Sequence, residues 1–312
     1  MKSPLHRSQP RDSTVLAEGG SRFTSGKRLG MVALVVGAIA IGFGPVFVRF
    51  SECGPIATAF WRIALPLPLM LAMVRREARP RETTRRRNGG VALLAGVCFA
   101  IDLALWHRAI LLTSVSNATL ETNLAVVFVP LLGWLFFRQS VSRRFMLAVG
   151  IALFGTVLLV GWNANLSAQS LKGDGLGILS ALFYSGYLLF IKAARDRGWN
   201  TAALMFTSGV ASSAVLLPLA ALAGEVILPV TGQGWLVVLA LAFFCQLLGQ
   251  SLIAYALAAL PASLTTVGLL LQPLTAAIAA WVLFAEWLTG LQILGGMILL
   301  FGIVAAKRSL RE

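Results

Sequence analysis

Residues 30–50 read GMVALVVGAIAIGFGPVFVRF, a run of 21 residues in which Arg49 is the one charged side chain. A helix that crosses a bilayer needs roughly 20 apolar residues, so this stretch alone predicts a transmembrane helix. The whole chain agrees, because 58% of its 312 residues are hydrophobic and 12% are charged, against about 45–50% and about 25% in an average soluble domain. The sequence therefore predicts an all-α membrane protein.

Nine further apolar runs follow this first one, and their length and spacing leave little room for a soluble domain. They lie near residues 55–74, 91–112, 115–137, 145–161, 175–193, 201–222, 235–256, 262–284 and 290–306. We therefore expect ten transmembrane helices, with a disordered cytoplasmic tail over residues 1–29 and a short cytoplasmic tail over residues 307–312.

Basic residues are concentrated in alternate connecting segments. With residues 1–29 in the cytoplasm, 22 of the 26 Lys and Arg residues fall on that side of the membrane, which is the bias that cytoplasmic loops show. We therefore expect both termini in the cytoplasm and the protein in the bacterial inner membrane. The net charge of +14 then needs no nucleic-acid partner, and we expect the arginine clusters to contact anionic lipid headgroups.

The second half of the sequence repeats the first. A shift of 147 residues aligns the fourth and fifth predicted helices with the ninth and tenth without a gap, so that Trp134 meets Trp281 and Gly155 meets Gly302. Because each half has five helices, the second half must start from the opposite side of the membrane, which makes an inverted repeat. The expected repeats span residues 30–161 and 175–306.

Several residues recur at the positions of a known transporter pattern. Pro55 and Arg62 lie around the second helix, and Pro273 is followed by Phe284-Ala285-Glu286 and by Gly295-Gly296. With these features the chain resembles the EamA type of the drug/metabolite transporter superfamily over residues 30 to 306.

The resemblance implies a central cavity lined by helices of both halves, and alternating access by rocking of the two five-helix units. The first half departs from the pattern, because the counterpart of Glu286 is Gln139, so an acidic residue at this position is not expected to be essential in both halves. In overall length and in the run from Asp102 to His107, the chain is also similar to bacterial exporters of aromatic and other amino acids.

Ten polar and aromatic side chains inside the predicted helices are candidates for binding a substrate, because polar groups within a membrane are costly and often functional. They are Asp102, Trp106, His107, Asn117, Glu121, Tyr184, Tyr187, Gln246, Gln250 and Gln272. Asp102 lies near the expected midplane, where it could bind a substrate ammonium group, move a proton, or be held by hydroxyl groups of a neighbouring helix. The amides could equally bridge packed helices.

Arg108 and Glu121 are each expected roughly 10 Å from the turn between the third and fourth helices, at about 1.5 Å per residue. An ion pair between them is therefore expected, with Arg62 as an alternative partner or as a ligand of a substrate carboxylate. Pro130 and Pro273 interrupt the fourth and ninth helices at nearly equivalent positions, and paired interruptions often frame a transporter's binding site.

No phosphate-binding G-x-x-x-x-G-K-S/T motif and no His/Cys/carboxylate grouping with metal-ligand spacing is found in the sequence, so we expect no ATP-driven step, no cofactor and no metal. The leading interpretation is a secondary transporter or facilitator that exports a small molecule: aromatic and other neutral amino acids, or related metabolites. A proton-coupled exporter of other metabolites or drugs is the alternative.

A membrane-embedded enzyme acting on a lipid-linked substrate is disfavoured, because the outer loops are short and nearly uncharged. A structural or regulatory membrane subunit would not need polar helix faces in both halves. The oligomeric state stays open, with a monomer as one alternative.

Overall fold

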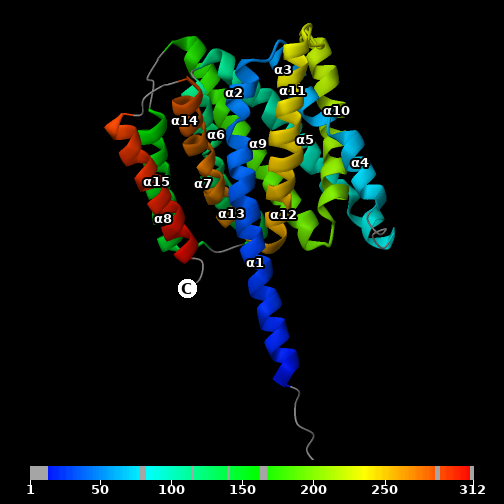
Figure 1. Ribbon diagram of the computed structural model, residues 1–312, viewed down its shortest axis with the longest axis vertical. Coiled ribbons are helices and arrows are strands. Elements are labelled where there is room, and N and C mark those ends of the chain that lie inside the picture. Colours follow the sequence, from blue (N-terminus) through cyan, green and yellow to red (C-terminus); the bar gives the residue numbers. More distant parts are fainter. Residues whose placement is uncertain are drawn as a thin grey trace, which may run out of the picture.

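The computed structural model describes residues 13–76, 82–113, 115–138, 141–161, 167–284 and 289–309, and within these ranges every regular element is a helix (Figure 1). Nine helical segments of the described residues are long and apolar enough to cross a membrane, and a tenth, shorter apolar segment covers Leu120–Phe136. The ten-helix membrane fold predicted from the sequence is therefore confirmed.

The helices of the first half are α1 (Ser13–Gly42), α2 (Gly44–Arg49), α3 (Pro55–Ala64), α4 (Leu67–Arg76), α5 (Glu82–Leu112), α6 (Val115–Thr122), α7 (Ala125–Phe137) and α8 (Arg143–Val160). Those of the second half are α9 (Ala168–Asp196), α10 (Thr201–Leu222), α11 (Gly232–Ala240), the π-helix η1 (Leu241–Gln250), α12 (Ser251–Ala259), α13 (Ala262–Leu269), α14 (Leu271–Phe284) and α15 (Gly290–Ser309). The chain enters and leaves the bundle at the same end (Figure 1). We call this end the termini side and the opposite end the far side.

Helix α1 extends beyond the bundle on the termini side (Figure 1). It begins at Ser13, so residues 13–29 are helical where the sequence predicted a disordered tail over residues 1–29, and residues 1–12 lie outside the described part. A helix that is already nucleated adds further residues at little cost, and the sequence has no proline between Pro10 and Pro45 to stop it.

Two transmembrane helices are interrupted at equivalent places in the two repeats. The fourth breaks between α6 and α7 at Asn123 and Leu124, and the ninth breaks between α13 and α14 at Leu270. Leu270 is 147 residues after Asn123, which is the shift that aligns the two halves. Pro273 lies in the first turn of α14, whereas Pro130 lies inside α7, so the paired breaks lie before the prolines.

The packing of α8 against α15 shows the same internal symmetry. A Cβ atom added at Gly155 would clash with the backbone nitrogen of Leu299, and one added at Gly302 would lie 2.5 Å from that of Ala152. Gly302 is the repeat counterpart of Gly155, and Leu299 is the counterpart of Ala152. The two contacts are therefore related by the symmetry of the repeats, as expected for an inverted repeat.

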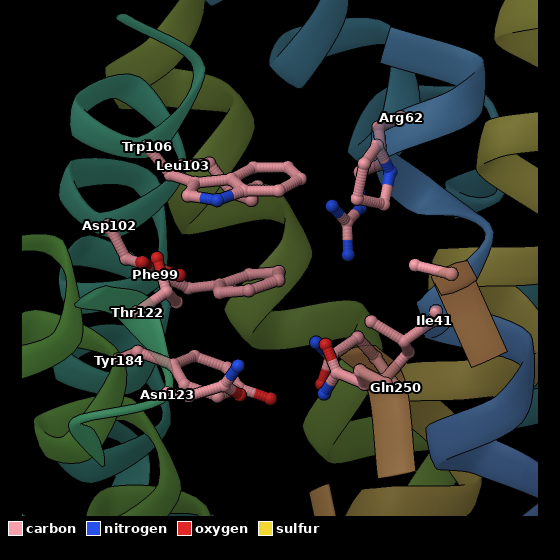
Figure 2. Close-up of a pocket in the computed structure, with 14 residues that line it drawn as sticks. Ile41, Arg62, Phe99, Asp102, Leu103, Trp106, Thr122, Asn123, Tyr184 and Gln250 are labelled. Carbon is pink, nitrogen blue, oxygen red and sulfur yellow. The ribbon is translucent and has the colours of Figure 1, made fainter. Parts of the chain in front are cut away.

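The eighth transmembrane helix changes its winding near its middle. α11 and α12 are α-helical, but the ten residues of η1 between them form a π-helix. π-Helical turns are rare and frequently occur at functional sites. The last residue of η1, Gln250, is fully buried and faces the interior of the bundle (Figure 2).

Candidate functional site

A cavity of about 50 Å³ lies inside the bundle, between helices of both halves (Figure 2). Its polar and aromatic walls are formed by Arg62, Phe99, Asp102, Trp106, Thr122, Asn123, Tyr184, Gln250 and Gln272. A water molecule needs about 10–15 Å³ by the same kind of measure. In this conformation the cavity therefore has room for a few waters and is smaller than an amino acid.

The cavity lies where transmembrane helices are interrupted. Gly42 is the last residue of α1, Thr122 is the last residue of α6 and Asn123 follows it in the break, and Gln272 follows the break at Leu270. Interrupted helices leave backbone polar groups without intrahelical partners, and such groups are tolerated at membrane depth only where protein or a water-filled cavity surrounds them. Breaks in both halves thus converge on one polar site.

Two opposite charges face each other across the cavity (Figure 2). On one wall, Asp102 of α5 is 4% exposed and accepts a hydrogen bond of 2.6 Å from the hydroxyl of Ser180 on α9. On the other wall, Arg62 of α3 is 3% exposed, and its guanidinium carbon lies 5.8 Å from the ring centroid of Phe99. The Nε of Arg62 has no hydrogen-bond partner among the described residues, so it can donate to a ligand.

Stacked aromatic rings form the part of the wall next to Asp102. The ring of Phe99 lies 4.4 Å from that of Tyr187 and 6.4 Å from that of Tyr184, and the two tyrosine rings are 5.8 Å apart. The Tyr187 hydroxyl donates to Oε1 of Gln250 at 3.4 Å. Trp106 adds an indole N–H that no other described residue accepts. The site therefore offers apolar ring surface beside the two charges.

Five of the ten candidate residues line this cavity, namely Asp102, Trp106, Tyr184, Gln250 and Gln272. Tyr187 lies directly behind the wall, where it stacks on Phe99. His107, Asn117, Glu121 and Gln246 are not among the residues that line it. His107 is fully buried, and its Nδ1 lies 2.7 Å from the backbone oxygen of Pro55, so it joins α5 to the start of α3. Asn117 and Gln246 are buried between helices.

The expected ion pair between Arg108 and Glu121 is wrong. Arg108 instead lies 4.0 Å from Oε1 of Glu225, in the connection after α10. Glu121 faces α9, where a Cβ atom added at Gly177 would clash with its carboxylate, and it lies near Asp174. The prediction rested on the expected depth of the two residues in the membrane, and depth does not determine the direction in which a side chain leaves its helix.

Four of the polar and aromatic lining residues were not among the ten candidates: Arg62, Phe99, Thr122 and Asn123. Phe99 precedes Asp102 by three residues on one helix, so helical spacing could have placed both on one face. Asn123 could not have been found this way, because it lies in the turn between α6 and α7.

Two carboxylates hold the connections together on the far side. Glu52 accepts hydrogen bonds of 3.0 Å from the backbone N–H groups of both Val230 and Thr231, and a further one from the Thr231 hydroxyl. The Thr231 hydrogen bonds lower the pKa of Glu52. Glu225 accepts hydrogen bonds of 2.8 and 2.9 Å from two backbone N–H groups in the first turn of α3, as expected for a carboxylate at a helix N-terminus.

These contacts join the segment before α3 to the segment between α10 and α11. The indole N–H of Trp61 adds a hydrogen bond of 2.6 Å to the backbone oxygen of Ile227. In this conformation hydrogen bonds therefore hold the two connections together at the far-side ends of the helices that carry Arg62 and Asp102.

Over the residues that the structure describes, no group of three or more His, Cys, Asp or Glu side chains could hold a metal ion.

Comparison with known proteins agrees with this architecture. The EamA-like transporter family matches residues 28–161 and 171–306. An uncharacterized transporter from Archaeoglobus fulgidus is 27% identical over 282 residues, which cover 90% of this chain and 97% of that protein. The uncharacterized transporter YxxF of Bacillus subtilis is 37% identical over 75 residues, 23% of this chain and 24% of that protein. A solved crystal structure shares the fold, with a TM-score of 0.69 at 14% identity over 92% of this chain and 98% of its own.

Proposed function

The chain belongs to the EamA-like transporter family, and from this premise we propose that it is a secondary transporter or facilitator that exports neutral amino acids, aromatic ones among them, or closely related metabolites. The observation that carries the proposal is the arrangement of Arg62 and Asp102 on opposite walls of the central cavity (Figure 2). The inner membrane of a bacterium, with both termini in the cytoplasm, is part of the same proposal, because the basic residues favour that orientation.

A zwitterion matches the two charged walls. The planar guanidinium of Arg62 suits a carboxylate, with which arginine forms two parallel hydrogen bonds. The carboxylate of Asp102 suits an ammonium group. Both residues are buried, and a charge held away from water is strongly stabilised by an opposite charge at short distance. An α-amino acid carries both groups on its α-carbon.

The remaining walls favour a substrate without a further charge. Among the described lining residues, Arg62 and Asp102 are the charged ones, and the others are apolar, aromatic, hydroxyl or amide side chains. The rings of Phe99, Tyr184 and Trp106 can pack against an apolar or aromatic substrate side chain. Gln250 and Gln272 can donate to or accept from a polar one.

Alternating access requires the walls of the cavity to move, and the interruptions in the helices are the points at which we expect this movement. A cavity of about 50 Å³ must widen to accept an amino acid. The turns that interrupt α6–α7 and α13–α14 lie at the cavity, so the segments on either side can pivot there. Opening to the far side would require the hydrogen bonds of Glu52 and Glu225 to break.

The test is uptake of labelled amino acids into liposomes that contain the purified full-length protein, with and without an imposed pH gradient. We expect saturable uptake of threonine, methionine or phenylalanine. Arg62→Gln should lower the transport efficiency by about tenfold or more, since a hydrogen bond to a charged group contributes roughly 1.5–3 kcal/mol. Arg49→Gln is the matched control, because Arg49 is an exposed arginine at the end of α2 that does not line the cavity.

The possible results distinguish an error in the proposed substrate from an error in the proposed transport function. Equal amino-acid uptake by the Arg62→Gln variant and the wild type would remove Arg62 from substrate binding. No uptake of any amino acid by the wild type would contradict the substrate proposal and favour export of other metabolites or drugs. Asp102→Asn tests coupling: if uptake persists but loses its dependence on the pH gradient, Asp102 carries the proton.

A further inference from the structure

A second cavity, larger than the central one, opens on the surface of the bundle. It has a volume of about 290 Å³ and is lined mainly by apolar side chains, among them Met70, Met73, Met205, Phe243 and Leu247. Three of the seven methionines of the chain are therefore in one pocket. Methionine is unbranched and polarizable, and it adapts to ligands of irregular shape.

The pocket opens toward the hydrocarbon region of the membrane. α4 packs against α10 at the edge of the bundle (Figure 1), and η1 forms the third side. At the mouth, Met73 is 45% exposed and Phe243 is 53% exposed, whereas Met70 and Met205 at the floor are almost completely buried. Outward-facing apolar side chains of a transmembrane bundle contact acyl chains, so an acyl chain is the apolar molecule available to fill the pocket.

Basic side chains mark the membrane surface beside the pocket. α4 ends on the termini side with Arg75 and Arg76, which are both exposed and follow Met73 within one turn. Arginines at this level attract the anionic headgroups of the adjacent leaflet. Along α4, the apolar pocket is thus followed by the two arginines, just as the acyl chain of a lipid is followed by its headgroup.

The floor of the pocket is in contact with the central cavity. The sulfur of Met205 lies 3.9 Å from the Tyr187 hydroxyl, and this hydroxyl donates to Gln250, which lines the central cavity. η1 lines both cavities, because Leu247 lies on the pocket and Gln250 on the site. A molecule bound in the pocket therefore packs against the outer side of the wall that contains the proposed substrate site.

We propose that this pocket binds one anionic phospholipid, with an acyl chain among Met70, Met73 and Met205 and the headgroup at Arg75 and Arg76. The chain fills apolar volume whose lining would otherwise lack packing partners. The headgroup gains two guanidinium partners that a zwitterionic or uncharged lipid would use less well. The proposal concerns a site distinct from the central cavity and does not depend on which substrate is transported.

Native mass spectrometry of the full-length detergent-purified protein, titrated with dioleoyl-phosphatidylglycerol or dioleoyl-phosphatidylcholine, tests the proposal. We expect one phosphatidylglycerol to bind more tightly than any that follow it, and more tightly than phosphatidylcholine. Arg75→Gln combined with Arg76→Gln should weaken this first binding by about 25-fold, at about fivefold for each arginine near the membrane surface. Met73→Trp, which puts a larger side chain at the exposed mouth, should abolish it.

The controls are on α15, which also ends on the termini side. Lys307→Gln combined with Arg308→Gln removes two basic residues from its last turn, and Met297→Trp changes an exposed methionine; both variants should retain the tight lipid. Equal binding of the two lipids, equal loss in the α15 variants, or full retention by Met73→Trp would overturn the proposal. Size-exclusion profiles and melting temperatures identify a misfolded variant, and if Met73→Trp is one, the arginine pair decides the question.

Discussion

Gly155 and Gly302 are exchanged by the symmetry that relates the two repeats, and each brings its own helix into backbone contact with the other. Gly155→Ala should therefore cost about 1–3 kcal/mol, the usual range for overpacking, because its Cβ would meet backbone atoms that no side-chain rotation can move. Gly150→Ala is the matched control on the same helix, since nothing lies within 4 Å of a Cβ atom there. Reversible unfolding of the two variants in mixed detergent would measure the difference, and equal stability would contradict the packing argument.

Removing the hydroxyl that binds Asp102 should impair transport. Ser180→Ala deletes the 2.6 Å hydrogen bond to the carboxylate and leaves a buried charge with less support. Because hydrogen bonds to charged groups contribute roughly 1.5–3 kcal/mol, we expect about a tenfold or greater loss of transport efficiency. Ser185→Ala is the control, because its hydroxyl donates within its own helix, to the backbone oxygen of Ala181. Uptake kinetics for both variants, at equal amounts of folded protein, would show whether only the first has an effect.

The hydrogen bonds of Glu225 to the start of α3 should contribute more to stability than its ion pair with Arg108. Glu225→Ala removes the acceptor of two N–H groups at the start of α3, and we expect a loss of about 1–3 kcal/mol of stability. Glu225→Gln retains an acceptor oxygen and should lose less. Arg108→Gln should change stability by less than about 1 kcal/mol, because this side chain is 51% exposed and its ion pair is 4.0 Å long. Thermal melting of the three variants gives the order, and a larger loss in Arg108→Gln than in Glu225→Ala would reverse our assignment.

The contact between Glu52 and Thr231 predicts a dependence of stability on acid. The hydrogen bonds from Thr231 lower the pKa of Glu52 below its ordinary value near 4.5. A group whose pKa is lower in the folded state contributes stability above its ordinary pKa and loses that contribution as the pH falls through the folded value. We therefore expect the melting temperature to fall less steeply below about pH 4.5 in Glu52→Gln than in the wild type. Parallel curves over that range would show that this carboxylate does not contribute.

Cys53 reports on the far-side connections. Its thiol donates to the backbone oxygen of Ile227 at 3.4 Å, and burial raises the pKa of the thiol, so the reactive thiolate is scarce at neutral pH. With Cys98 and Cys245 replaced by Ala, we expect a membrane-impermeant maleimide to label Cys53 slowly, and only from the far side. Glu225→Ala in the same background should speed the labelling, since it loosens the neighbouring connection. Labelling from the termini side would contradict the topology.

Local sequence features were enough to predict the spanning helices and the repeat. Apolar length and the position of basic residues each act within a single helix or loop, so they need no tertiary information. The aligned halves likewise predicted the relation between Gly155 and Gly302. The partner of Arg108 could not be obtained in this way, because it depends on the rotation of α5 relative to a loop more than one hundred residues away.

Only part of the candidate site was predicted from the sequence, because the direction of a side chain depends on how the helices pack. Asp102, Trp106 and Tyr184 are at positions that sequence marked as unusual, since polar or amphipathic side chains are costly in a membrane. Glu121 was equally unusual, yet it faces Gly177 and Asp174. Composition shows that a polar group needs a partner, and only the packing of the helices shows whether the partner is another side chain or a cavity.

The π-helix η1 has a consequence for insertions and deletions. A π-helix closes its hydrogen bonds over one residue more than an α-helix does, so the eighth span holds surplus residues between α11 and α12. Deleting one residue from Leu241–Gln250 could convert the segment to ordinary α winding while both flanks keep their orientation. In an uninterrupted span such as α9 or α10, the same deletion would turn every following side chain by about 100°. η1 is thus a segment from which the loss of one codon would leave the orientation of α11 relative to α12 nearly unchanged.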